Sequence, residues 1–119
     1  MSENRVRRVA EQIKKEVSQI IRSEIKDPRI ASLVSVTEVR VSRDLSYATI
    51  YVSVYGSEAE KRETFKTLWR ASGFIRSEIG KRIRLRRTPE INFAEDSSME
   101  YGARIDEVLK TLHEEKQDQ

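Results

Sequence analysis

Hydrophobic and polar positions follow a helical period at the start of the chain. Apolar residues recur at helical spacing there, with arginine and lysine on the other faces: Val6, Val9, Ile13, Val17, Ile20 and Ile21. This pattern predicts an amphipathic helix over residues 5–26. Asp27-Pro28 should end it, because proline disfavours helical geometry at the residue before it.

The pattern then changes to the alternation of strands. In residues 33–42, LVSVTEVRVS, the valines switch parity, which predicts a β-bulge near Thr37-Glu38. A turn at residues 42–44 leads into residues 45–55, LSYATIYVSVY. One side of this run is apolar (Ala48, Ile50, Val52, Val54) and the other is polar or aromatic (Tyr47, Thr49, Tyr51, Ser53, Tyr55). The two runs predict a hairpin with one face on a core.

A second helical period extends over residues 58–84. Ser57 to Glu60 form a capping box at its start. The predicted buried line, with Trp69 at its edge, is Phe65, Leu68, Ser72, Ile75, Ile79 and Ile83. Glycine inside a helix is unfavourable and commonly marks a kink. We therefore expect a break near Gly73.

The remaining sequence predicts a strand and a helix. Residues 89–96, PEINFAED, should form a third strand with Ile91 and Phe93 toward the core. A second capping box at 97–100 precedes apolar residues at helical spacing: Tyr101, Ile105, Val108, Leu109 and Leu112. We expect one domain over residues 1–113 and a frayed tail over 114–119.

Composition excludes several classes of site. The chain has 119 residues, 37% of them hydrophobic, which is enough for one domain with its own core. The absence of cysteine excludes disulfides and thiolate metal sites. His113, the lone histidine, lies near a polar C-terminus, so we expect no metal, no cofactor and no catalytic centre. No run suits a bilayer or a signal peptide, and a cytoplasmic protein without membrane contact is expected.

Charge is distributed unevenly. Residues 70–87, RASGFIRSEIGKRIRLRR, hold seven basic side chains and one acidic side chain, whereas residues 88–119 hold three and nine. Most of these cations are arginine, whose planar guanidinium suits phosphate. A positive charge concentrated in one segment indicates an anionic partner, most commonly nucleic acid.

At 100° per residue, one face of this helical segment holds a row of cations together with both of its interior glycines. That face, opposite the buried line, holds Arg62, Lys66, Arg70, Gly73, Ser77, Gly80, Lys81 and Arg84. Glycine there lets a phosphate approach the backbone, and the N-terminus of a helix beginning after the break favours an anion. The predicted RNA-binding residues are Arg70, Ser72, Gly73, Arg76, Ser77, Gly80, Lys81, Arg82, Arg84, Arg86 and Arg87. A further extension of this surface would include Arg5, Arg7, Arg8, Arg62 and Lys66.

Other interpretations of the same residues stay open. The charged face could be merely solvated, and Gly73 and Gly80 could serve a kink and a close packing contact. The three tyrosines of residues 45–55 could stack on bases or stabilise the sheet. A protein-interaction module, with the cations only steering a protein partner, is the alternative function. A nuclease using magnesium at Asp44, Asp96 and Glu100 is weaker, because turn and cap roles suffice for the two aspartates.

Over nearly its whole length the chain resembles the ribosome-binding factor A family. The resemblance rests on RVAEQIKKEVSQII, DPRI, VSVTEVRVSRDLSYATIYVSVYG, RASGFIRSEIGKRIRLRRTPEINFAEDSS and YGARIDEVL, in that order. It implies an α+β, type II KH-like domain, a three-stranded sheet with helices on one face. An Ala-x-Gly kink at Ala71-Ser72-Gly73 stands where ordinary KH domains have a Gly-x-x-Gly loop. A broad electrostatic contact with structured RNA is therefore expected rather than a sequence-specific grip.

The resemblance also implies a function. It implies a non-enzymatic, monomeric assembly factor that binds free small ribosomal subunits. Such a factor assists maturation of the 5′ region of 16S rRNA and is important in the cold. Whether other assembly factors act with it is left open.

Overall fold

The computed structural model describes residues 3–25 and 34–96 of the chain. The elements follow the order α1 (Glu3–Ser23), β1 (Val34–Val41), β2 (Tyr47–Val54), α2 (Glu58–Arg70), α3 (Ser72–Arg82) and β3 (Glu90–Glu95). The first helix thus begins two residues before its predicted start and ends three residues before its predicted end. Asp27-Pro28 and the predicted C-terminal helix and tail lie outside the described residues.

The three strands form one sheet in the order β1-β2-β3. β1 and β2 are the predicted antiparallel hairpin, and β3 runs parallel to β2 on its other side. The predicted bulge is confirmed: Val36 pairs with Val52 and Glu38 with Tyr51, which leaves Thr37 as the extra residue. The hydroxyl of Thr37 donates a hydrogen bond to the Asp96 carboxylate (2.5 Å), so the bulge also binds the end of β3.

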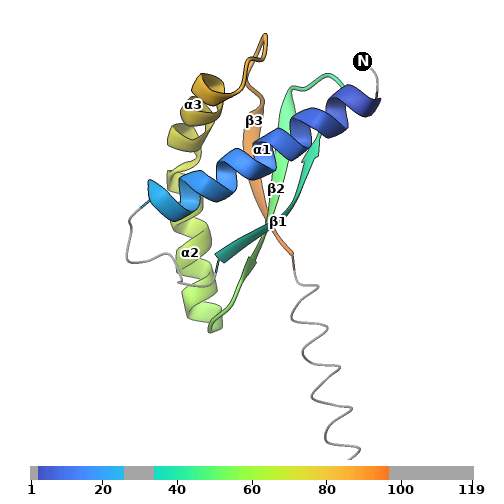
Figure 1. The fold of residues 1–119 in the computed structure, drawn as a ribbon. Helices are drawn as coiled ribbons and strands as arrows, with labels where there is room; N and C mark the ends of the chain where they lie inside the picture. Colours follow the sequence, from blue (N-terminus) through green and yellow to red (C-terminus); the bar gives the residue numbers. More distant parts are fainter. Residues whose placement is uncertain (1–2, 26–33, 97–119) are drawn as a thin grey trace, which may run out of the picture.

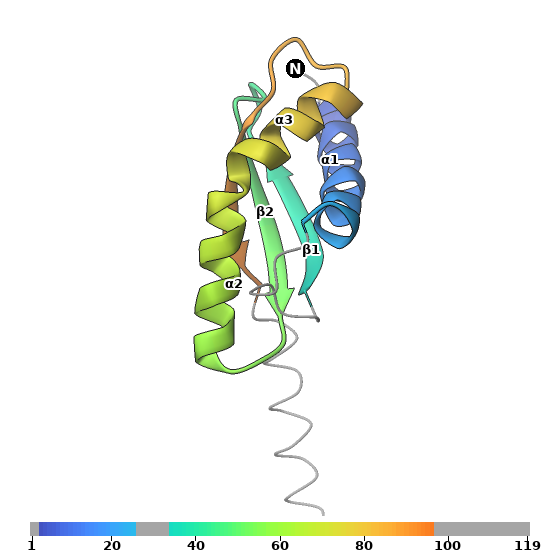
Figure 2. The same cartoon turned by 90° about the vertical axis from the view of Figure 1, so that its left-hand side faces the viewer.

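All three helices cover the same face of the sheet (Figures 1 and 2). α1 lies over β1, while α2 and α3 lie over β3, and α1 also contacts α3. The predicted apolar side of β2 is buried beneath them, from Ala48 to Val54, together with Ile91 and Phe93 of β3. The tyrosines of β2 lie on the opposite side. This arrangement is the predicted α+β sheet with helices on one face.

The long second helical period is divided into α2 and α3. Its capping box is confirmed: the Glu60 N–H donates to Ser57 Oγ (3.1 Å), and the Ser57 N–H donates to Glu60 Oε1 (3.2 Å). The break falls at Ala71, two residues before Gly73, within the predicted kink. Leu68 and Ile75 are buried on either side of it, so both helices stay on the core.

Among the described residues, no helix is long and apolar enough to cross a membrane.

Candidate nucleic-acid interface

The predicted cationic face is exposed along its whole length. Every member is exposed to solvent: Arg62, Lys66, Arg70, Gly73, Ser77, Gly80, Lys81 and Arg84. The kink at Ala71 divides this face into one part on α2 and another on α3, and the two helices point in different directions (Figures 1 and 2). A continuous helix would have a single row of cations. The structure instead has two cationic segments, one on α2 and one on α3, that meet at the kink.

The loop between α3 and β3 carries three more exposed arginines, Arg84, Arg86 and Arg87. Ile83 is buried, and Leu85 packs partly buried against the core between the arginines. This alternation fixes the loop by its apolar residues and leaves the guanidinium groups in water. We call Ile83 to Pro89 the arginine loop.

Two predicted RNA-binding residues hold this loop in place. Arg76 donates from Nε to the carbonyl of Pro89 (3.2 Å) and from Nη2 to the carbonyl of Thr88 (3.1 Å). A Cβ on Gly80 would lie 2.8 Å from Thr88 Oγ1, closer than such atoms approach. Gly80 therefore makes room for Thr88, which is the packing role left open above. Gly73 differs, because a Cβ there would meet nothing within 4 Å.

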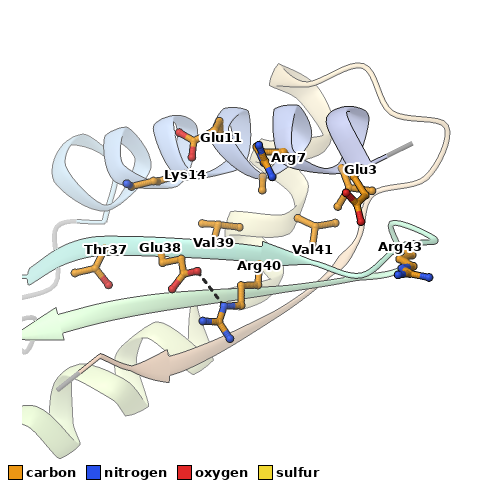
Figure 3. Close-up of a pocket in the computed structure, with 12 residues that line it drawn as sticks. Glu3, Arg7, Glu11, Lys14, Thr37, Glu38, Val39, Arg40, Val41 and Arg43 are labelled. Atoms are coloured by element: carbon orange, nitrogen blue, oxygen red, sulfur yellow. Dashed lines mark hydrogen bonds and ion pairs between the residues drawn. The ribbon is translucent and has the colours of Figure 1, made fainter. Parts of the chain in front are cut away.

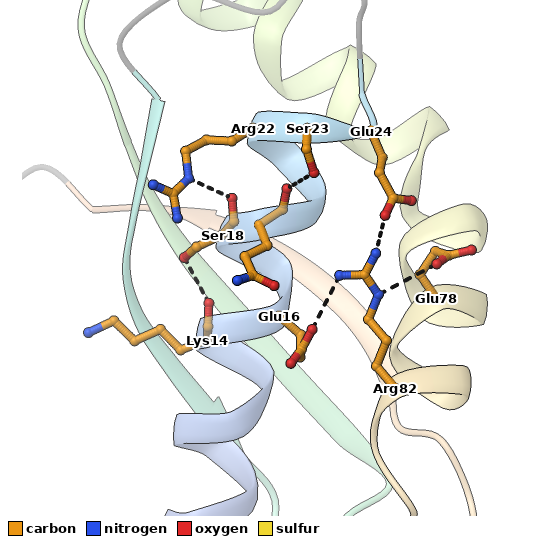
Figure 4. Close-up of polar contacts among 9 residues, drawn as sticks. Lys14, Glu16, Ser18, Arg22, Ser23, Glu24, Glu78 and Arg82 are labelled. Carbon is orange, nitrogen blue, oxygen red and sulfur yellow. Dashed lines mark hydrogen bonds and ion pairs between the residues drawn. The ribbon is translucent and has the colours of Figure 1, made fainter.

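Arg82 lies among three carboxylates, a group we call the α1–α3 seam (Figure 4). Its guanidinium bonds Glu16 (3.2 Å) and Glu24 of the α1 region, and it lies 3.6 Å from Glu78 of α3. The hydrogen bond to Glu16, together with the neighbouring charges of Glu24 and Glu16, raises the pKa of Arg82. Because three acids surround this one cation, Arg82 stabilises the contact between helices and adds little positive potential to the surface.

Several arginines without an acidic partner among the described residues lie on α2 and in the arginine loop. Within residues 3–25 and 34–96, no acidic side chain forms an ion pair with Arg62, Arg70, Arg84, Arg86 or Arg87. Among the described residues, Lys81 pairs with Glu78 (3.4 Å) and Lys66 with Glu63 (3.7 Å), and both lysine side chains are themselves well exposed. Such pairs are weak, so both lysines stay available to an anion.

The start of α1 borders a different kind of surface. Arg5, Arg7 and Arg8 are exposed there, at the same end of the molecule as the arginine loop (Figures 1 and 2). Arg7 lines a groove of about 820 Å³ between α1 and β1 (Figure 3). Cations and carboxylates alternate around this groove, and Glu38 and Arg40 pair at 2.9 Å. Its mixed charge makes it a poor site for a polyanion.

Tyr47 and Tyr51 of β2 and Tyr55, which directly follows it, differ in their surroundings. The Arg40 guanidinium lies 5.2 Å from the centre of the Tyr51 ring, a cation–π contact within the sheet. Tyr47 and Tyr55 are exposed. Tyr51 therefore serves the sheet, while the other two rings are accessible to a partner.

The two aspartates considered for magnesium lie apart. Asp44 is in the turn before β2, where hydrogen bonds from Ser46 and Ser42 lower its pKa to about 2. Asp96 follows β3, beside the far end of β2, where its N–H donates to the Val52 carbonyl (2.8 Å). Since β2 and β3 are parallel, the two carboxylates belong to opposite ends of the sheet and cannot share an ion.

A hollow on α2 was not predicted from the sequence. It measures about 510 Å³ and is lined by Glu58, Lys61, Arg62, Phe65, Lys66, Trp69, Arg70 and Glu95. We call it the α2 hollow. The available signal is the pair Phe65 and Trp69, one turn apart beside the cationic row, but the helical period predicts Phe65 for the core and Trp69 for its edge.

Comparisons with known proteins agree with this architecture. The family model described as ribosome-binding factor A matches residues 5–109. The ribosome-binding factor A of Caldanaerobacter subterraneus subsp. tengcongensis is 56% identical over 96% of this chain and 93% of its own length.

The solved structures that this chain resembles are also of ribosome-binding factor A. The crystal structure of ribosome-binding factor A from Thermus thermophilus matches with a TM-score of 0.67 and 28% identity, covering 76% of this chain and 94% of that one. A homology model of the Thermus thermophilus factor, fitted into the cryo-electron microscopy map of a 30S complex with it, matches with a TM-score of 0.62 and 28% identity. That match covers 74% of this chain and 91% of that one. These matches confirm the KH-like fold, and the chain belongs to the ribosome-binding factor A family.

Proposed function

We propose that this protein is a non-enzymatic ribosome assembly factor that binds free small ribosomal subunits through 16S rRNA. The observation that carries the proposal is the arginine loop, whose three exposed arginines lack acidic partners among the described residues. The family relation and the 30S complex of a relative support the same partner. The function extends to maturation of the 5′ region of 16S rRNA and to growth in the cold. We propose that the protein acts as a cytoplasmic monomer, alongside other assembly factors.

Within this proposal, some residues contact the RNA directly and others position the arginine loop. Arg70, Lys81, Arg84, Arg86 and Arg87 contact phosphates, and open space at Gly73 allows a backbone to approach α3. Arg76 and Gly80 act indirectly, because they hold the arginine loop. Ser72 and Ser77 border the same surface, although the hydroxyl of Ser72 donates to the Trp69 carbonyl (2.7 Å).

A charge-reversal experiment tests this proposal. Replacing Arg84, Arg86 and Arg87 with glutamate should abolish co-sedimentation with free small subunits. The control reverses Lys14, Lys15 and Arg22 of α1, which lie outside the arginine loop and the predicted RNA-binding residues, so the change in net charge is the same. Equal loss in both triple variants would mean that net charge alone decides binding, and retained binding in the first would overturn the assignment.

Salt dependence gives a second measurement. If about five phosphates are engaged, the logarithm of affinity should fall with the logarithm of salt concentration at a slope of roughly −3 to −5. Each arginine removed from the loop should make the slope shallower by about one. A flat salt dependence contradicts phosphate contact.

The alternative is a module that docks a protein, favoured by the exposed rings of Tyr47 and Tyr55. In that case charge reversal mainly slows association, while alanine at either tyrosine speeds dissociation. Association and dissociation rates on immobilised small subunits separate the two functions.

A further inference from the structure

The α2 hollow combines exposed aromatic surface with a row of cations. Arg62, Lys66 and Arg70 stand at successive i, i+4 positions of α2 and form one row. Phe65 and Trp69 form the adjacent row, also i, i+4, and line the hollow. At about 510 Å³, its volume lies within the usual range of small-ligand sites.

Trp69 is held in place yet remains accessible. Its ring meets that of Phe93 edge to face, with centroids 6.3 Å apart and planes at 79°. Phe93 is buried in β3, so this contact fixes the indole against the sheet. The side chain nevertheless stays 48% exposed. A flat ring that is fixed before binding loses little conformational freedom when another ring stacks on it.

The two acidic groups that line the hollow share one lysine and are outnumbered by its cations. Lys61 Nζ lies 3.7 Å from both Glu58 Oε1 and Glu95 Oε1, and its side chain is only 8% exposed. Arg62 and Arg70 have no such partner in the part of the chain that the structure describes. The charges exposed beside the two aromatic rings are therefore mainly positive.

We propose that the α2 hollow binds an unpaired RNA base, which stacks on Trp69 while Arg62 and Arg70 contact the phosphates on either side. This inference rests on the proposed function, because the base would belong to the RNA held by the arginine loop. Unpaired bases are recognised by stacking on aromatic side chains, and positively charged grooves follow the backbone beside them. An aromatic floor beside unpaired guanidinium groups fits a base with its phosphates.

Trp69 is the only tryptophan of the chain, so its fluorescence reports on this site alone. A short, unstructured oligouridylate should quench that emission in a saturable way. An abasic oligonucleotide of the same length offers the same phosphates without rings and should not quench. Because both substitutions at position 69 remove the fluorophore, affinity is compared through the anisotropy of a fluorescein-labelled oligouridylate. Trp69→Ala should weaken its binding about tenfold, and Trp69→Phe should weaken it less, because one aromatic ring remains.

Phe74 supplies the matched control. It is 45% exposed, much like Trp69, but lies on α3 and does not line the hollow. Phe74→Ala should leave both the quenching and the affinity unchanged. Circular dichroism of each variant verifies folding, and Trp69→Phe keeps the test decisive if the alanine variant does not fold.

The outcomes separate this inference from the proposed function. If small subunits bind and salt weakens binding, but oligouridylate leaves Trp69 emission unchanged, the base site is overturned and the assembly function stands. Quenching by the abasic chain, or by an acidic leucine-rich peptide in place of RNA, also overturns it. If neither oligouridylate nor small subunits bind, both proposals fail.

Discussion

The α1–α3 seam and the arginine loop both use arginine, at positions two residues apart, in opposite surroundings. Arg82 of the seam is bound by Glu16, Glu24 and Glu78, and its side chain is 25% exposed. Arg84 of the loop is exposed, with no ion-pair partner among the described residues. The same positive charge therefore holds two helices together at Arg82 and is exposed to solvent at Arg84. The difference shows that the number of cations in a segment does not measure its capacity to bind an anion.

The largest effect that tests this comparison is expected from removing the charge of Arg82. Arg82→Met should clearly lower the free energy of unfolding, because the three carboxylates around it lose their common partner. Arg84→Met should change it by less than about 0.5 kcal/mol. Urea unfolding followed by circular dichroism measures both.

In RNA binding, Arg84→Met should have a larger effect than Arg82→Met, which is the opposite of their order in stability. Arg84→Met should weaken binding to free small subunits and make the salt slope shallower, whereas folded Arg82→Met should retain both properties. If Arg82→Met reduced the salt slope as much as Arg84→Met, the assignment of Arg82 to the seam would be wrong.

Arg76 extends the comparison to a cation that acts through the backbone. Arg76→Met removes hydrogen bonds to the carbonyls of Thr88 and Pro89 and should cost about 1 kcal/mol of folding stability. Amide hydrogen exchange should accelerate at Glu90, directly after the arginine loop, whose N–H donates to the Ser46 carbonyl (2.8 Å), but not in α1. Unchanged exchange at Glu90 would show that Arg76 does not hold the loop.

How much of this could be predicted differs between fold and site. The strands, the bulge at Thr37 and the capping box at Ser57 follow from local patterns, and each is confirmed. The partners of Arg82 could not be predicted, because Glu16 is 66 residues away in the sequence and Glu24 is 58 away. Only the packing of α1 against α3 brings these charges together.

The buried face of α2 also could not be predicted from the spacing of its apolar residues. Thr64 and Thr67 are buried there although they are polar, because each hydroxyl donates to the carbonyl four residues earlier, at 2.9 Å. Threonine satisfied in this way packs like an apolar residue. Phe65 and Trp69 are consequently placed at the edge of the core, where the α2 hollow forms.

The two glycines of α3 extend the comparison, because Gly80 packs against Thr88 whereas Gly73 faces open space. Gly80→Ala should destabilise the protein by about 1 kcal/mol, because overpacking against Thr88 exceeds the gain in helix propensity. Combining it with Thr88→Ala should restore most of the loss. Thermal unfolding of the single and double variants measures this coupling, and a Gly80→Ala protein as stable as the original would contradict the close contact.

Gly73→Ala should have the smallest effect and the opposite sign. Nothing lies within 4 Å of the added methyl group, and alanine restricts the unfolded chain more than glycine does, so stability should rise by about 0.4–1 kcal/mol. If RNA approaches the backbone of α3 at this point, the same methyl group should weaken binding to small subunits while the fold becomes more stable. A stabilised variant with unchanged affinity would show that Gly73 serves the kink alone and would move the phosphate contacts to the arginine loop and to α2.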